Sequence, residues 1–214
     1  EIAQSEGYDY ISVAHHKDDQ AESILAHIIR GSGLNGLTGM SVVQSEYAIP
    51  VVRPLLDVTK ENLLAYIGTK HISYCVDSTN EDVRYQRNRI RHRIIPELEA
   101  VNPAVVDAIV RLGSSVNEDV MVISDLTSRT FDKLVSIDDD EVRISRRALR
   151  QEPLAIQRRL WQRLVSTIDS DLTLTSAHQE QLLDIVNTGE KKTFTIKSIK
   201  VIAQCDTIKV YCKH

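Results

Sequence analysis

The chain has 214 residues, of which 42% are hydrophobic and 26% are charged, a composition that is ordinary for one large globular domain or two small ones. No run approaches the roughly eighteen apolar residues of a membrane span, and the opening residues lack the basic-then-apolar order of a secretion signal, so we expect a cytoplasmic protein with no membrane partner. The net charge of −4 argues weakly against a nucleic-acid partner, and three cysteines without a C-x-x-C pair indicate neither a zinc site nor a disulfide scaffold.

A first strand and a first helix are predicted from residues 8–30. The segment YDYISVAHH (8–16) has the pattern of a short buried strand that runs into a polar turn, the edge at which open parallel sheets bind ligands. Residues 17–30 carry apolar side chains at i, i+3, i+4, i+7 and i+8, the spacing of an amphipathic helix. The residues of this apolar stripe are Ala21, Ile24, Leu25, Ile28 and Ile29.

The opposite face of the same helix is polar, and it carries Asp19, Glu22, Ser23, Ala26 and Arg30. Two interpretations stay open for it. It is a solvated face whose carboxylates favour the N-terminal end of the helix dipole, or Asp19 and Glu22 are a pair that grips an ammonium group or a metal. His15 and His16 follow the strand, and capping or packing explains them as well as catalysis does.

The loop RGSGLNGLTGM (30–40) contains the spacing G-x-G-x-x-G at Gly31, Gly33 and Gly36. In the dinucleotide-binding fingerprint this spacing follows a strand and opens a helix, whereas here it follows a helix. We therefore do not interpret it as that fingerprint. Gly31 is predicted to end the helix with a positive φ, and the later glycines let the chain fold back toward the strand ends.

Further strands and helices alternate up to residue 77. IPVVRPLLD (49–57) is strand-like, residues 60–70 are helical with Thr59 as N-cap, and ISYCVD (72–77) reads as another short strand. Because parallel strands need crossover helices, this alternation predicts an α/β layer with a parallel sheet.

A helix rich in arginine is predicted from residue 84 to about residue 98. Arg87 and Arg91 lie about 40° apart on its apolar face, at about 100° per residue, whereas Arg89 and Arg93 point to the opposite side, where a solvated or phosphate-binding role is natural. A guanidinium on the core side needs an acidic or phosphate partner, because an unpaired buried charge is costly. Asp19 and Glu22 are candidates for that partner.

The pattern changes in the second half of the chain. A long helical pattern at 103–134 leads to an acidic turn at 138–141 and a strand-like EVRIS. Helices are predicted around 153–168 and 175–187, and the last residues alternate as an antiparallel meander does. We place a domain boundary between residues 100 and 140, with residues 1–100 as one domain, 101–137 as a helical linker and 138–214 as a second, smaller and mainly helical α+β domain.

Basic residues cluster in residues 83–96, in 145–163 and in the tail 190–214, so basic faces can coexist with a mildly acidic total. Five motifs then occur in one order that resembles the tRNA(Ile)-lysidine synthetases, members of the PP-loop family of N-type ATP pyrophosphatases. The resemblance is dense over residues 8–100 and looser beyond. The motifs are VAHHKDDQAES, IIRGSGLNGLTGM, RPLLDVTKENL, DSTNED and RNRIRHRIIPELE.

The resemblance implies that residues 1–100 are the C-terminal part of a PP-loop domain and that residues 138–214 recognise tRNA. It implies an enzyme that uses ATP, with Mg²⁺ bridging the phosphates, to adenylate the C2 carbonyl oxygen of the first cytidine of a CAU anticodon in an isoleucine tRNA. Lysine then attacks C2, and AMP and pyrophosphate are released. The roles it implies are a lysine site at Asp19, Glu22 and Arg87; an ATP site at His15, Arg30 and Gly31, with His15 and Arg30 catalytic; and tRNA contacts at Arg89, Arg93, Arg146, Arg147, Arg158 and Arg159.

One departure is that the family's ATP-binding signature S-G-G-x-D-S does not occur in this sequence, so we expect the chain to be a fragment that is inactive by itself. Three alternatives stay open. The first is a sibling enzyme that thiolates tRNA, which typically relies on cysteines for sulfur transfer, whereas no C-x-x-C pair occurs here. The second is a non-catalytic RNA-binding module that would use the basic helices and the lysine-rich meander. The third is an α/β domain without these functions, which requires the order of the motifs to be coincidence. A homodimer also stays open.

Overall fold

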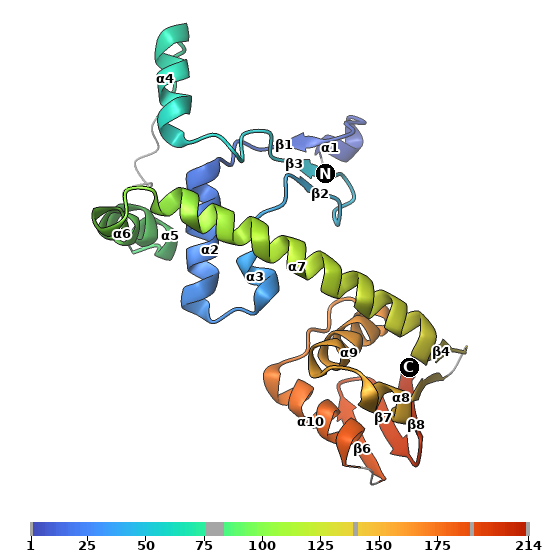
Figure 1. Cartoon of the computed structure of the whole chain (residues 1–214). Coiled ribbons are helices and arrows are strands. Elements are labelled where there is room, and N and C mark those ends of the chain that lie inside the picture. Colours follow the sequence, from blue (N-terminus) through green and yellow to red (C-terminus); the bar gives the residue numbers. More distant parts are fainter. Residues whose placement is uncertain (1, 76–83, 139–140, 189–190, 213–214) are drawn as a thin grey trace. The chain divides into compact units, whose positions relative to one another are not determined.

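The structure is a computed structural model that describes residues 2–75, 84–138, 141–188 and 191–212 (Figure 1). The chain divides into two compact units, Glu1–Val120 and Met121–His214, which we describe one at a time as unit 1 and unit 2. The division lies inside the long helix α7 (Val105–Leu134), within the span where the sequence pattern changes.

The sheet of unit 1 has the strand order β1-β3-β2. Strand β1 pairs with β3 in parallel and β2 pairs with β3 in antiparallel, so the expected parallel arrangement holds for one pair of strands. The prediction that the first strand is buried is wrong, since Ile11 is 39% exposed. The reason is the small size of this sheet, because two-residue strands give little area for other elements to cover. The strands are β1 (Ile11–Ser12), β2 (Val43–Gln44) and β3 (Val51–Val52).

The helices of unit 1 begin and end close to where the sequence predicts. Helix α2 runs over Lys17–Arg30 and ends at Gly31, whose φ of 76° confirms the predicted left-handed end. The predicted N-cap of α4 (Lys60–Lys70) is also confirmed, because the Thr59 hydroxyl accepts a hydrogen bond from the Asn62 amide. The prediction of a strand at 72–77 is wrong for residues 72–75, and residues 76–77 lie outside the described part. Two short helices complete this region, α1 (Ile2–Ser5) and α3 (Leu34–Leu37).

The predicted arginine-rich helix is present in three successive segments, which are α5 (Gln86–Arg89), the π-helical η2 (Ile90–Ile94) and α6 (Ile95–Val101). The π-helical turn ends two residues before Pro96. Proline has no N–H for an α-helical bond to the carbonyl four residues earlier and crowds that carbonyl, so the backbone widens there. The motif DSTNED lies outside the described residues.

Helix α7 packs on α2 through a glycine. A Cβ atom on Gly113 would lie 2.7 Å from Cδ1 of Ile24 and 3.1 Å from the Leu37 carbonyl, so a larger residue would push the helices apart. Of the predicted apolar stripe on α2, Ala21 and Ile24 are buried, whereas Ile28 and Ile29 are exposed near the end of the helix.

Unit 2 contains a five-stranded antiparallel sheet with the order β4-β5-β8-β7-β6, which confirms the predicted meander and the predicted strand at EVRIS (β5) and adds β4. Helices α9 (Leu154–Ile168) and α10 (Ser176–Asn187) match the predictions, whereas the short α8 (Arg146–Gln151) was not predicted. Alternate strand residues pack with the helices around Trp161. The strands are β4 (Val135–Ile137), β5 (Val142–Ser145), β6 (Lys192–Ile196), β7 (Ile199–Gln204) and β8 (Thr207–Cys212).

Candidate functional site

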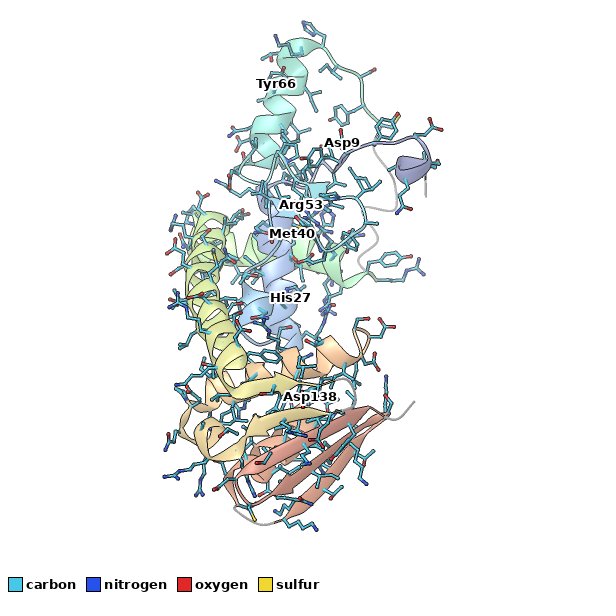
Figure 2. All side chains as sticks on the ribbon, turned by 90° about the vertical axis from the view of Figure 1, so that its right-hand side faces the viewer. Asp9, His27, Met40, Arg53, Tyr66 and Asp138 are labelled. Carbon is cyan, nitrogen blue, oxygen red and sulfur yellow. The ribbon has the colours of Figure 1, made fainter. Side chains whose placement is uncertain are left out.

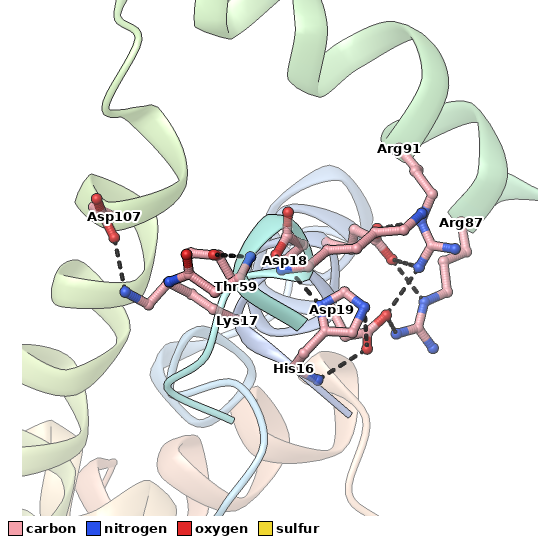
Figure 3. A network of polar contacts seen from close by, with 11 residues as sticks. His16, Lys17, Asp18, Asp19, Thr59, Arg87, Arg91 and Asp107 are labelled. Carbon is pink, nitrogen blue, oxygen red and sulfur yellow. Dashed lines mark hydrogen bonds and ion pairs between the residues drawn. The ribbon is translucent and has the colours of Figure 1, made fainter. Parts of the chain in front are cut away.

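Two carboxylates of α2 meet two guanidinium groups of the arginine-rich helix in unit 1 (Figure 3). Arg87 donates to Asp19 Oδ1 and to Glu22 Oε2, both at 2.9 Å. Arg91 donates to Asp19 Oδ1 at 2.8 Å, to Glu22 Oε1 at 2.6 Å and to Glu22 Oε2 at 3.0 Å. We call Asp19, Glu22, Arg87 and Arg91 the charge cluster.

The carboxylates of the charge cluster are withdrawn from solvent, with side-chain exposures of 9% for Asp19 and 1% for Glu22. The interpretation of a solvated polar face is therefore wrong for these two residues. Desolvating them is tolerable because each carboxylate is paired with both guanidinium groups. The prediction that Arg87 and Arg91 pair with Asp19 and Glu22 is confirmed, but the prediction that both face the core is wrong for Arg87, whose side chain is 48% exposed. The hydrogen bond that Arg91 donates to Glu22 also raises the pKa of Arg91.

The N-terminal end of α2 orients the cluster. The backbone N–H of His16 donates to Asp19 Oδ2 at 3.0 Å, and the His16 ring lies 3.3 Å from both Asp18 and Asp19. Asp18 Oδ2 accepts from the Lys60 amide at 2.8 Å, which ties the start of α4 to α2. The hydrogen bond with His16 lowers the pKa of Asp18 to about 2. Two short aspartate contacts thus fix the helix start on which the charge cluster depends.

His15 is held by an arginine that the sequence analysis did not single out. Arg53 is buried and donates from Nε to His15 Nδ1 at 3.2 Å, and its other nitrogens bond the Ser41 carbonyl and the Gln44 side chain. Burial lowers the pKa of His15 below its usual value, which favours the neutral ring that accepts this hydrogen bond. The sequence did contain a signal for this role, because Arg53 stands between the apolar residues 51–52 and Pro54. A charged side chain in such an apolar run needs polar partners. Figure 2 labels Arg53 and Met40 in this region.

The glycine-rich loop folds back against α2. Gln20 donates to the Met40 carbonyl at 2.9 Å and accepts from the Met40 amide at 2.7 Å. Gly39 has a φ of 71°, and a Cβ there would lie 2.7 Å from the Gln20 amide. A pocket of about 350 Å³ lies between this loop, the Asp57 region and α7.

The residues predicted to bind ATP are not all brought together. His15 precedes α2, whereas Arg30 and Gly31 stand at its other end, and a helix of 14 residues is about 20 Å long. Arg30 is exposed. The structure therefore groups the predicted lysine-site residues closely and separates His15 from the other two nucleotide-site candidates.

The arginines predicted to contact tRNA differ in exposure. Arg89 and Arg93 line an apolar groove of about 490 Å³ with Ile29 and Leu98. In unit 2, Arg147 and Arg158 are exposed and Arg159 is half-buried. Arg146 is buried, and its guanidinium donates to the carbonyls of Val186 and Cys205, so its surroundings are those of a structural arginine.

Within the described residues, no group of three or more histidine, cysteine, aspartate or glutamate side chains is arranged to hold a metal ion. The helices of the described segments include none that is both long and apolar enough to cross a membrane.

Comparisons with known proteins agree with this geometry. Residues 1–98 match the PP-loop domain family. The tRNA(Ile)-lysidine synthase of Porphyromonas gingivalis is 44% identical over 103 residues, which are 48% of this chain and 22% of that protein. The proteins of the same name from Geobacter sulfurreducens and Bacillus subtilis are 31% and 30% identical over 86% and 88% of this chain. The chain spans 39% and 41% of their lengths. The resemblance predicted from the five motifs is confirmed.

Proposed function

Because residues 1–98 belong to the PP-loop domain family and most of the chain is similar to tRNA(Ile)-lysidine synthases, we propose that it serves the ATP-dependent ligation of lysine to an isoleucine tRNA. ATP adenylates the C2 carbonyl oxygen of the first cytidine in a CAU anticodon and releases pyrophosphate. The amine of lysine then attacks C2, and AMP leaves with that oxygen. This is a carbon–nitrogen bond-forming ligase that modifies tRNA.

The observation that carries the proposal is the charge cluster. A free lysine has two ammonium groups and one carboxylate, so it needs anionic and cationic partners close together. Asp19 and Glu22 supply the anionic partners, and Arg87, within 2.9 Å of both, supplies a cation that also reaches solvent. Charge-assisted hydrogen bonds of this kind are among the strongest that proteins make to small ligands.

We assign ATP to the region from His15 to Arg30 and Gly31. His15 offers a neutral ring nitrogen, Arg30 offers an exposed guanidinium that can offset phosphate charge, and Gly31 leaves the backbone uncovered beside it. Mg²⁺ would neutralise phosphate charge when bound. Since the described residues contain no cluster of metal ligands, we assign it no residue and no step.

For the tRNA we propose contacts from both units. Arg89 and Arg93 stand on the same helix as the charge cluster, where phosphates next to the anticodon would pass. Arg147, Arg158 and Arg159 would bind backbone phosphates from unit 2, with Arg146 placing α8 from beneath. The domain roles follow this division, with residues 1–100 for catalysis, 101–137 as linker and 138–214 for tRNA recognition. A homodimer and a cytoplasmic location belong to the same proposal.

Calorimetric titration of lysine into the chain tests the lysine site. Asp19→Asn and Glu22→Gln should each weaken binding about tenfold or more, since each removes a charged partner. Glu61→Gln, on exposed α4, is the matched control and should leave binding unchanged. Equal affinity for lysine and for hexanoate, which has the same carbon chain but no amine, would count against the site.

Binding of two tRNAs tests the partner. The isoleucine tRNA with a CAU anticodon should bind more tightly than the same tRNA with its first anticodon cytidine replaced by uridine. Equal binding to both, with a steep loss of affinity on adding salt, would favour a non-catalytic RNA-binding module instead.

A further inference from the structure

Every carboxylate oxygen of the charge cluster already accepts a hydrogen bond. Asp19 Oδ1 accepts from both arginines, and Asp19 Oδ2 accepts from the His16 amide. Glu22 Oε1 accepts from Arg91, and Glu22 Oε2 accepts from both arginines. The two carboxylates and two guanidinium groups sum to zero charge. A ligand ammonium added to this set would leave an excess positive charge beside Glu22, whose side chain is 1% exposed.

The two arginines hold the carboxylates unequally. Arg91 makes three of the five hydrogen bonds, and its side chain is 23% exposed. Arg87 makes two, and its side chain is 48% exposed. Water can solvate the guanidinium of Arg87 when it leaves the carboxylates. Releasing Arg91 would break three hydrogen bonds instead of two, and its guanidinium is less accessible to water. Arg87 is therefore the cation that is easier to displace.

We propose that Arg87 occupies the ammonium position of the ligand-free site and is exchanged for an ammonium group of the ligand, while Arg91 stays in place and positions both carboxylates. This inference rests on the proposed lysine site. Exchange keeps the charge of the buried set at zero. It also frees Arg87 to bind the carboxylate of the same ligand, so the site selects an amino acid over a plain diamine and leaves the second amine of lysine outside the buried set.

A pair of probes separates this role from a structural one. Cadaverine has the two amines and the carbon spacing of lysine but no carboxylate, so it can take the ammonium position and cannot bind Arg87. In the full chain, Arg87→Gln should bind cadaverine about tenfold more tightly than the unaltered chain, because the competing cation is gone, and should bind lysine more weakly. The preference for lysine over cadaverine should therefore collapse.

Two further variants serve as comparisons in the same binding experiment. Arg91→Gln should change the affinities for both probes by a similar factor and leave their ratio unchanged, because the ligand carboxylate that distinguishes the probes binds Arg87 and not Arg91. Arg111→Gln, exposed on α7, should change neither affinity. If Arg87 had only a structural role, Arg87→Gln would bind lysine and cadaverine more weakly by the same factor. That result, or an affinity for cadaverine that does not rise, would overturn the inference.

A measurement on the unaltered chain guards against a variant that fails to fold. In nitrogen-15 spectra the side-chain Nε–H signal of Arg87 should shift when lysine is added, whereas that of Arg91 should stay. Movement of both or of Arg91 alone contradicts the exchange. If lysine does not bind the unaltered chain, the proposed lysine site fails, but cadaverine binding to Arg87→Gln still decides whether Arg87 fills a cation position.

Discussion

The two units are stabilised in different ways. Unit 2 has a continuous apolar core in which Trp161, Leu160, Leu164, Leu182 and Ile208 are almost fully buried against the sheet. In the described part of unit 1 the buried apolar residues are few, namely Ala21, Ile24, Leu56, Ile90 and Ile95. Asp19, Gln20, Glu22 and Arg53 are buried beside them. Apolar burial holds unit 2, whereas hydrogen bonds between charged groups join the elements of unit 1.

This contrast has a functional meaning. Buried ion pairs contribute little net stability but become costly once one partner is removed. A site made of them therefore keeps its charged groups desolvated and oriented for a charged ligand, at the expense of stability. Unit 1 contains such a set of buried charged groups, whereas the core of unit 2 is apolar.

The largest effect is expected in unit 2. Leu182→Ala should lower the free energy of unfolding by about 2–5 kcal/mol, because it removes buried methyl groups and leaves a cavity. Trp161 is the only tryptophan of the chain, so its fluorescence during urea unfolding reports on this core. Leu154→Ala, at an exposed position on α9, should change the unfolding midpoint little. A small effect of Leu182→Ala would show that apolar burial is not what holds unit 2.

A smaller effect is expected when the charge cluster is broken. Glu22→Gln should cost about 2 kcal/mol of local stability, since two guanidinium groups lose a charged acceptor but Arg87 can turn to water. Hydrogen exchange of the α2 amides should accelerate, while the Trp161 unfolding midpoint should stay. Glu61→Gln on α4 is the control. Unchanged exchange in α2 would mean that the cluster is dispensable for the fold of unit 1.

How much of this could be predicted from the sequence differs between elements. The bounds of α2 and the left-handed Gly31 follow from local rules. So does the pairing of Arg87 and Arg91 with acidic partners, because a guanidinium predicted on an apolar face requires an anion. Periodicity shows that the two faces of α2 differ, but not which neighbour covers each. Asp19 and Glu22 are therefore buried while Ile28 and Ile29 are exposed, against the simple expectation.

Other features depended on contacts far apart in the sequence. The apolar run around Arg53 indicates that this arginine needs partners, but only the fold shows that they are His15, Ser41 and Gln44. The exposure of the strand at Ile11 reflects how few residues pair in its sheet. The π-helical turn before Pro96 could have been suspected from the proline, whereas the six-residue α8 is too short to give a period.

Acid should weaken unit 1 at the start of α2. The folded-state pKa of Asp18 is about 2, below its ordinary value of 3.8, so its contribution is present above about pH 4 and is lost as the pH falls toward 2. The loss should be about 1 kcal/mol, because the side chain is one-third exposed and solvent screens its contacts. Amide exchange at the start of α4, measured at pH 4 and below, should show this in the unaltered chain and not in Asp18→Asn. The same pH dependence in the variant would assign it to another group.

The smallest effect is expected for two exposed ion pairs of α7, one that joins this helix to α2 and one that lies within α7 itself. Helix α7 carries Asp107, which bonds Lys17 of α2 at 3.0 Å, and Asp125, which bonds Arg129 one turn along the same helix. Both pairs are solvent-exposed, so each substitution to asparagine should cost about 0.5 kcal/mol or less and the cost should vanish in 1 M salt. Only Asp107→Asn should speed amide exchange in α2, because only that pair holds a second element. Equal responses in α2 would mean that the exposed pair of unit 1 adds nothing to the joining of its helices, and that the charge cluster and the Asp18 contact hold α2 without it.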